Sequence, residues 1–236
     1  MSVWKARRFW TEACEVPAEG GFAVALDGRP LRTPARAPVI VPTEALARAL
    51  AEEWQAQSEV IDPHSMPRTR MTNSAIDTVA RNRAAVFETV AAYGDCDLLC
   101  YRASHPEALV ARQAAAWDPL LTWAEEALSA RLEIAAGVMH RPQPPEALAA
   151  LRAALDRAGA FELAALHELV ALSGSLVIGL RVGAGGADPA ALWEVSRLDE
   201  HWQAELWGRD DEAEAQAETR REAFLLAAEY HRLARG

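Results

Sequence analysis

The sequence predicts an α+β protein: a small β-rich N-terminal domain over residues 1–65, which includes one helix, followed by a larger all-α domain over residues 66–236. Two patterns support this fold class. Near the N-terminus, Phe22, Val24 and Leu26 alternate with small or polar residues, which is the period of a half-buried strand. Further along the chain the apolar spacing lengthens to that of a helix and stays so to the end.

The β-rich domain is expected to be built around a hairpin. Asp27 and Gly28 follow the first strand and form a strong turn dipeptide, so both are predicted to be structural. The segments RPLRTP and APVIVP then supply short strands. Prolines at 30, 34, 38 and 42 exclude a continuous central strand, because proline cannot donate to a β ladder. The preceding segment, RRFWTEACEV, is expected to pair with this hairpin.

The first predicted helix lies in the segment TEALARALAEEW. Leu46, Leu50 and Trp54 recur at steps of four, and Thr43 follows Pro42 as a plausible N-cap. Trp54 closes this apolar stripe beside the chain reversal at IDP. We therefore expect Trp54 to be structural and to join the β-rich domain to the helical one.

The helical domain is expected to open with a helix from about Thr69 to Tyr93 that Gly94 ends. Two more helices are expected to begin at Pro106 and at the Asp118-Pro119 pair. Trp117, just before that pair, fits an apolar stripe and is predicted to be a structural core residue.

Four further segments complete the predicted helical domain. The amphipathic segment PPEALAALRAALDRAG should end its helix at Gly159. The segment FELAALHELVALSGSLVIGLRV is apolar nearly throughout, which predicts a single buried central helix. Asp188-Pro189 should start the next helix, and the last one should end near Arg235.

Composition excludes several classes of function. The formal charge of −10 argues against nucleic acid as the main partner, because phosphate binding needs clustered Lys and Arg. Lys5 is the only lysine, so a phosphate-binding GK[ST] loop is absent and lysine-based catalysis is disfavoured. The sequence has no apolar run of membrane-spanning length and no secretory signal. With three cysteines outside any framework pattern, a cytoplasmic location is predicted.

Acidic and aromatic residues concentrate in LDEHWQAELWGRDDEAEAQAE, residues 198–218. One hypothesis is an uncharacterised metal-dependent or acid–base enzyme that uses Asp199, Glu200, His201 and Glu205. Glu205 and His201 would share a helix face, but no second histidine stands at ligand spacing, so a polar helix face is the simpler interpretation.

Cys96 and Cys100 also lack a second pair of ligands, so we predict no metal site and expect both to be small buried side chains.

The same stretch can equally be a docking surface. Trp202 and Trp207 stand among carboxylates, and aromatic residues framed by charge are enriched at protein interfaces. We therefore predict that this surface binds a protein partner through Asp199, Glu200 and Glu205, with the two tryptophans as apolar anchors. No catalytic constellation is recognised elsewhere, which favours a binding protein over an enzyme.

Six stretches follow one another along the chain and carry a resemblance to a known family: LDGRPLRTP, VPTEALARALAEEWQAQSEVIDPHSMPRTRMTNSAID, YGDCDLLCYRA, RQAAAWDPLLTW, LSGSLVIGL and LDEHWQAELWGRDDEAE. Together they resemble the ATP synthase assembly chaperones that hold the α subunit of the catalytic sector. The resemblance runs from about Phe9 to about Glu214, and Cys96 stands where a threonine is expected.

This resemblance implies a β-rich N-terminal domain, a helical C-terminal domain, no catalysis and no cofactor. It implies that the chain binds the free α subunit and prevents its aggregation until the β subunit replaces it. Mitochondrial relatives begin with a transit peptide, which this sequence lacks, so a bacterial, cytoplasmic member is expected. We also expect the free protein to be a monomer.

Overall fold

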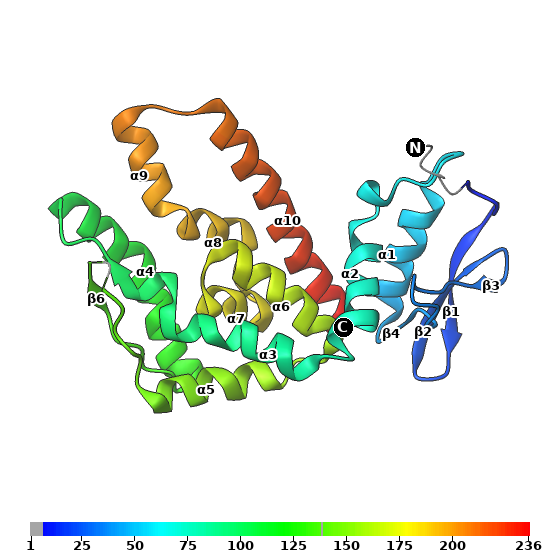
Figure 1. Cartoon of the computed structure of the whole chain (residues 1–236), viewed down its shortest axis with the longest axis horizontal. Helices are drawn as coiled ribbons and strands as arrows, with labels where there is room; N and C mark the ends of the chain where they lie inside the picture. Colours follow the sequence, from blue (N-terminus) through cyan, green and yellow to red (C-terminus); the bar gives the residue numbers. More distant parts are fainter. Residues whose placement is uncertain (1–6, 138) are drawn as a thin grey trace. The chain divides into compact units, whose positions relative to one another are not determined.

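A computed structural model of the chain describes residues 7–137 and 139–236 (Figure 1). A small sheet forms at the N-terminus and helices follow to the C-terminus, so the predicted α+β class is confirmed. The chain forms two compact units. The first unit consists of residues 7–83 with Ala160–Ala165 and Glu229–Gly236, and the second unit of Ala84–Gly159 and Leu166–Ala228. The first unit therefore extends past the expected boundary at residue 65; whether 1–65 and 66–236 fold separately stays a prediction.

The sheet of the first unit is antiparallel. Its strands are β1 (Ala13–Ala18), β2 (Gly21–Leu26), β3 (Arg29–Pro30) and β4 (Ile40–Val41). β2 pairs with β1 along its whole length and with both β3 and β4. The expected strand, the pairing of the upstream segment and the short return strands are thus confirmed.

Gly21 is required where β2 meets β4. Its φ is +153°, and a Cβ there would lie 2.3 Å from the carbonyl oxygen of Val41.

The turn after β2 is held by its first residue as well as by its glycine. Asp27 and Gly28 have φ of 47° and 77°, as a two-residue hairpin turn with positive φ at both positions requires. The Asp27 carboxylate accepts hydrogen bonds from the backbone amides of Thr11 and Glu12 at 2.9–3.0 Å. The Glu12 amide, and then that of Thr11, lower the Asp27 pKa. These contacts support the structural role predicted for both residues.

Helix α1 (Glu44–Gln55) covers this sheet. The Thr43 hydroxyl accepts from the Leu46 amide at 3.1 Å, so the expected N-cap is confirmed. Trp54 packs against Trp10 with ring centroids 5.2 Å apart, inside the first unit. This contact supports a structural role for Trp54 and places it at the join between α1 and the N-terminal segment.

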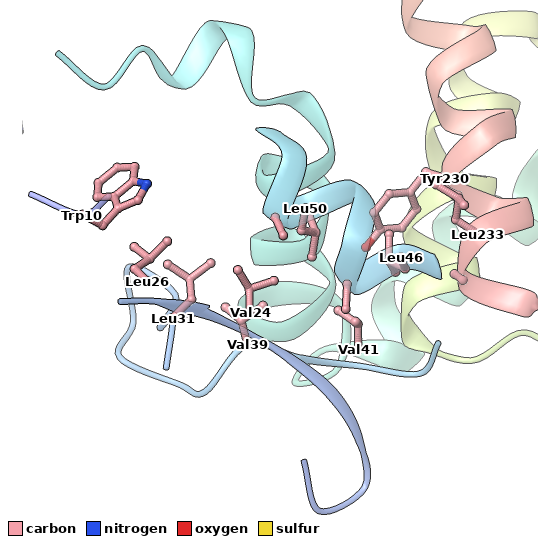
Figure 2. Close-up of a cluster of buried hydrophobic side chains, with 14 residues drawn as sticks. Trp10, Val24, Leu26, Leu31, Val39, Val41, Leu46, Leu50, Tyr230 and Leu233 are labelled. Carbon is pink, nitrogen blue, oxygen red and sulfur yellow. The ribbon is translucent and has the colours of Figure 1, made fainter. Parts of the chain in front are cut away.

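The core of the first unit also takes in residues from the far end of the chain. Figure 2 shows Tyr230 and Leu233 beside Leu46 of α1 and the strand residues Val24 and Val41. Both come from the last turns of α10 (Asp211–Arg235). Tyr230 is fully buried and its hydroxyl bonds that of Thr72 at 2.9 Å. The C-terminus is therefore part of the first unit's core.

The prediction of one continuous helix over residues 69–93 is wrong. The structure has α2 (Pro67–Ser74), a π-helical turn at Ala75–Val79 and α3 (Arg83–Ala91). The Asn82 side chain donates to the Thr78 carbonyl at 3.0 Å, at the break before α3. Asparagine competes in this way with helical hydrogen bonds.

Gly94 does not end a helix in the expected way. It lies in a 3-10 turn, Ala92–Cys96, and is buried. A Cβ at this position would lie 3.2 Å from Leu151 Cδ1, so close packing against α5 (Pro145–Asp156) explains the glycine.

The expected helix start at Asp118-Pro119 is also wrong. Both residues lie inside one continuous helix, α4 (Glu107–Leu128). Instead of capping, Asp118 pairs with Arg102 at 2.9 Å. Trp117 is fully buried, and its indole nitrogen donates to the Val195 carbonyl at 2.9 Å.

The apolar segment expected to be one central helix is two, α6 (Ala160–Ser173) and α7 (Leu176–Ala184). Gly174, with φ +71°, turns the chain, and Ser175 caps α7 by accepting from the Ile178 amide at 3.0 Å. The fully buried Asp97 accepts from the Val177 amide of the same helix. Burial raises the pKa of Asp97 to about 6, against the lowering effect of its hydrogen bonds.

The remaining elements of the second unit are short apart from α10. β5 (Tyr101–Arg102) pairs in parallel with β6 (Ala135–Ala136). α8 (Pro189–Ser196) begins at Asp188-Pro189 as predicted, and the Asp188 carboxylate caps it by accepting from the Ala190 amide at 3.0 Å. α9 (Leu198–Trp207) precedes α10. Among the described residues, no helix is both long and apolar enough to cross a membrane.

Candidate partner-binding surface

The predicted docking residues lie on a segment that contains no buried side chain. Leu198 and Phe224 are buried, and every residue from 199 to 223 is partly or fully exposed. This segment, the α9–α10 arm, comprises most of α9, the connection at 208–210 and the first half of α10 (Figure 1). Helices normally bury one face against their own protein, so an arm without a buried face is a candidate for binding something else.

Side chains of α4 hold the α9 half of the arm. Asp199 accepts from the Gln113 side chain at 2.7 Å, and Gln113 is itself buried. Arg112 pairs with Glu205 at 2.7 Å and stacks over the Trp202 ring, with 4.9 Å between its Cζ and the ring centroid. The Arg112 hydrogen bond lowers the pKa of Glu205. Three of the five predicted docking residues thus also position α9.

Glu200 and Trp207 both lie on the exposed surface of α9. The Glu200 side chain is exposed, and it pairs with Arg197 of its own helix at 2.6 Å. Trp207 is 79% exposed at the end of α9, and its neighbour Leu206 is 57% exposed. Sequence reasoning missed Leu206, because a single leucine among charged residues carries no signal of its own exposure.

The α10 half of the arm adds charge. The segment 199–222 contains nine acidic residues and three arginines. The second unit as a whole contains 22 acidic side chains and 11 arginines, so it carries the whole negative excess of the chain. An acidic arm that carries exposed Leu206 and Trp207 at the end of α9 can contact a surface that is both basic and apolar.

The geometry does not favour the alternative enzyme site. Asp199 contacts Gln113, Glu200 pairs with Arg197, and Glu205 pairs with Arg112. His201 lies 3.6 Å from Glu194. The four residues of the hypothesis therefore engage four different partners. In the described part of the chain, no group of three or more His, Cys, Asp or Glu side chains is arranged to hold a metal ion.

The two cysteines proposed above as small buried residues differ from each other. Cys100 is buried, as expected, whereas Cys96 is exposed, so that expectation is wrong for Cys96. Cys96 is the last residue of a 3-10 turn, and its thiol donates to the Ala92 carbonyl at 3.8 Å. Burial, first, and then the neighbouring carboxylates raise the pKa of the Cys96 thiol.

Comparison with known proteins gives the family. The sequence model of the ATP12 chaperone protein family matches residues 7–125, half of the chain. The chain belongs to the ATP12 chaperone family. The resemblance noted in the sequence is thus confirmed, and it places the chain in a family that acts in ATP synthase assembly.

Solved structures of relatives cover nearly the whole chain. Crystal structures of Atp12 from Paracoccus denitrificans and of a point mutant of that protein are 52% identical to the chain, with TM-scores of 0.95. They cover 98% and 99% of this chain, respectively, and each is matched over 100% of its own length. The Atu1473 protein of Agrobacterium tumefaciens is 44% identical, with a TM-score of 0.91 over 98% of this chain and 86% of its own.

One similar protein is eukaryotic. The mitochondrial protein atp12 of Schizosaccharomyces pombe is 25% identical over 219 residues, which span 88% of this chain and 75% of the relative.

Proposed function

We propose that this ATP12-family protein binds the unassembled α subunit of ATP synthase and prevents its aggregation until the β subunit takes its place. An α subunit without its neighbour exposes an interface rich in apolar area, which makes it prone to aggregate. A chaperone that covers this interface has to shield it and then leave when a larger native interface forms. We further propose that it does so without catalysis or a cofactor, as a monomer in the cytoplasm.

The observation that carries this proposal is the exposure of Trp207 and Leu206 on an acidic arm that has no buried face of its own. Tryptophan is enriched among the residues that dominate binding energy at interfaces. Carboxylates around such an anchor favour encounter with a basic surface and specify its orientation, without requiring a large apolar contact. Such a charge-framed surface suits a complex that has to dissociate during assembly better than an obligate apolar interface does.

Within the arm, we propose that Glu200 contacts the α subunit directly. Its carboxylate is exposed, and it pairs with Arg197 in the preceding turn. Asp199, Trp202 and Glu205 contribute mainly by holding α9 against α4, and Trp207 provides the apolar anchor.

Glu200→Lys tests this assignment. Reversing the charge should weaken α-subunit binding by about tenfold or more, because it places a like charge against a basic surface. The change also removes the Arg197 pair and puts a cation at a helix N-terminus, which costs about 1 kcal/mol of stability or less. Suppression of α-subunit aggregation, followed by light scattering, should therefore fall while the melting curve stays close to that of the unaltered chain.

Glu126→Lys is the matched control, since Glu126 is exposed on α4 and outside the arm. It makes the same change in net charge and should leave aggregation suppression intact. A Glu200→Lys protein that protects the α subunit as well as Glu126→Lys does would refute the assignment of Glu200. A Glu200→Lys protein that unfolds would make the residue structural.

A further inference from the structure

One arginine of the chain already contacts both an acidic and an aromatic side chain of the arm. Arg112 reaches from α4 to α9, where its guanidinium pairs with Glu205 at 2.7 Å and stacks on Trp202 at 4.9 Å. We call the position formed by Glu205 and Trp202 the guanidinium slot. The Arg112 and Glu205 side chains are 43% and 55% exposed, so the slot opens to solvent.

The chemistry of the slot selects arginine. A planar guanidinium can form an ion pair with a carboxylate and stack on an indole at the same time, whereas an ammonium group acts as a point charge. The slot lies on the same short helix as the exposed Trp207, within about one and a half turns before it. A protein that docks on the arm therefore brings its own side chains close to the slot.

We propose that the guanidinium slot binds an arginine side chain of the client protein, and that Arg112 is an internal stand-in that the client's arginine displaces. This inference rests on the proposed function and specifies the chemistry of the client surface: an arginine next to apolar area. Exposed ion pairs and exposed cation–π contacts are individually weak, so an incoming arginine can replace Arg112 at little net cost.

Displacement need not detach α9. The bond between the Gln113 side chain and Asp199 is independent of Arg112, and Leu198 stays buried at the start of the helix. Arg112 can thus leave the slot while α9 keeps its place on α4. A purely structural Arg112 would act differently, because its removal would loosen the docking surface and weaken client binding.

The second unit contains a matched control for this contact. Arg152 pairs with Glu88 and lies 4.9 Å from the Phe87 ring centroid, and its side chain is 42% exposed. It combines the same acid and aromatic contacts at the same exposure, but outside the arm. Arg152→Ala therefore reports the general effect of removing such an arginine from this protein.

The first experiment tests the slot without any client. Protein labelled with 5-fluorotryptophan is titrated with N-acetyl-arginine amide, and the fluorine resonance of Trp202 is identified through Trp202→Phe. In Arg112→Ala the resonance should shift with millimolar affinity, and in the unaltered chain and in Arg152→Ala it should shift far less, because Arg112 competes from within. N-acetyl-lysine amide should be a weaker ligand. Glu205→Gln should abolish the response of Arg112→Ala.

The second experiment uses the isolated α subunit. Emptying the slot by Arg112→Ala should raise α-subunit affinity by about three- to tenfold, the range expected for a weak exposed contact. Arg152→Ala should leave the affinity unchanged. In a Glu205→Gln background, Arg112→Ala should give no gain, since the slot has lost its carboxylate. Arg112→Gln repeats the test with a longer side chain that keeps more of the apolar contact.

The two experiments test the guanidinium slot and the proposed function separately. If the Trp202 resonance in folded Arg112→Ala and Arg112→Gln ignores arginine amide, or if both variants bind the α subunit no better than Arg152→Ala, the slot is refuted and the proposed function stands. If the unaltered chain does not bind the α subunit at all, the proposed function fails, and the titration still decides whether the slot accepts a guanidinium.

Discussion

Tyr230→Ala should lower the free energy of unfolding of the first unit by about 3–5 kcal/mol, as large aromatic-to-alanine changes in a core do. Tyr230 is fully buried in the cluster formed by the strands, α1 and the end of α10 (Figure 2). Its truncation would leave a cavity and would also leave the buried Thr72 hydroxyl without its partner. Urea unfolding followed by circular dichroism measures the loss.

Tyr230→Phe separates the two contributions. It keeps the ring and removes only the hydroxyl, so it should cost about 1 kcal/mol. If Tyr230→Ala unfolds at the same urea concentration as the unaltered chain, the end of α10 is not part of the first unit's core, and the packing described for Tyr230 and Leu233 is incorrect.

Trp117→Ala should have an effect of similar size in the second unit, about 3–5 kcal/mol. The indole is fully buried, stacks with Arg102 at 5.1 Å and donates to the Val195 carbonyl at 2.9 Å. Removing it would take the indole donor from that carbonyl and the aromatic face from the Arg102 guanidinium, in addition to leaving a cavity. Thermal unfolding should show a lower transition temperature.

Trp117→Phe is the control for the cavity. It fills most of the volume and loses the indole donor, so its transition should lie between those of the unaltered chain and Trp117→Ala. A Trp117→Ala protein with unchanged thermal stability would show that the predicted structural role of Trp117 is wrong.

The sequence predicted correctly those turns and helix starts that are determined by residues close together in the chain. The positive φ values of the turn at Asp27-Gly28 and the helix starts after Thr43 and Asp188 each depend on residues within three positions. The break at Gly174-Ser175 is also local, but it lies inside an apolar run whose periodicity masks it. The break before α3 is local too, whereas the errors at Asp118 and Gly94 involve contacts more distant in sequence. Gly94 is a glycine because Leu151 packs on it, and no local pattern reports that contact.

In the candidate site, too, local features were predictable and contacts between distant residues were not. Composition predicted that acids and tryptophans gather near residue 200 and lie on a helix, which α9 confirms. It could not indicate which of them α4 engages, because Gln113 is 86 residues from Asp199 and Arg112 is 93 from Glu205. Nor could it reveal that the first half of α10 contains no fully buried residue, since alternating alanines and acids also fit an ordinary surface helix.

Hydrogen exchange of the chain, alone and with an equimolar amount of isolated α subunit, tests most directly whether the arm is the docking surface. Without the α subunit, amides of 211–223 should exchange quickly, because this half of α10 has no buried side chain and can open locally from its N-terminal end. With the α subunit bound, exchange should be slower across the arm and unchanged in α1, whose buried face is already covered. Binding of the α subunit with no change in exchange across 199–223 would show that the arm is not the docking surface.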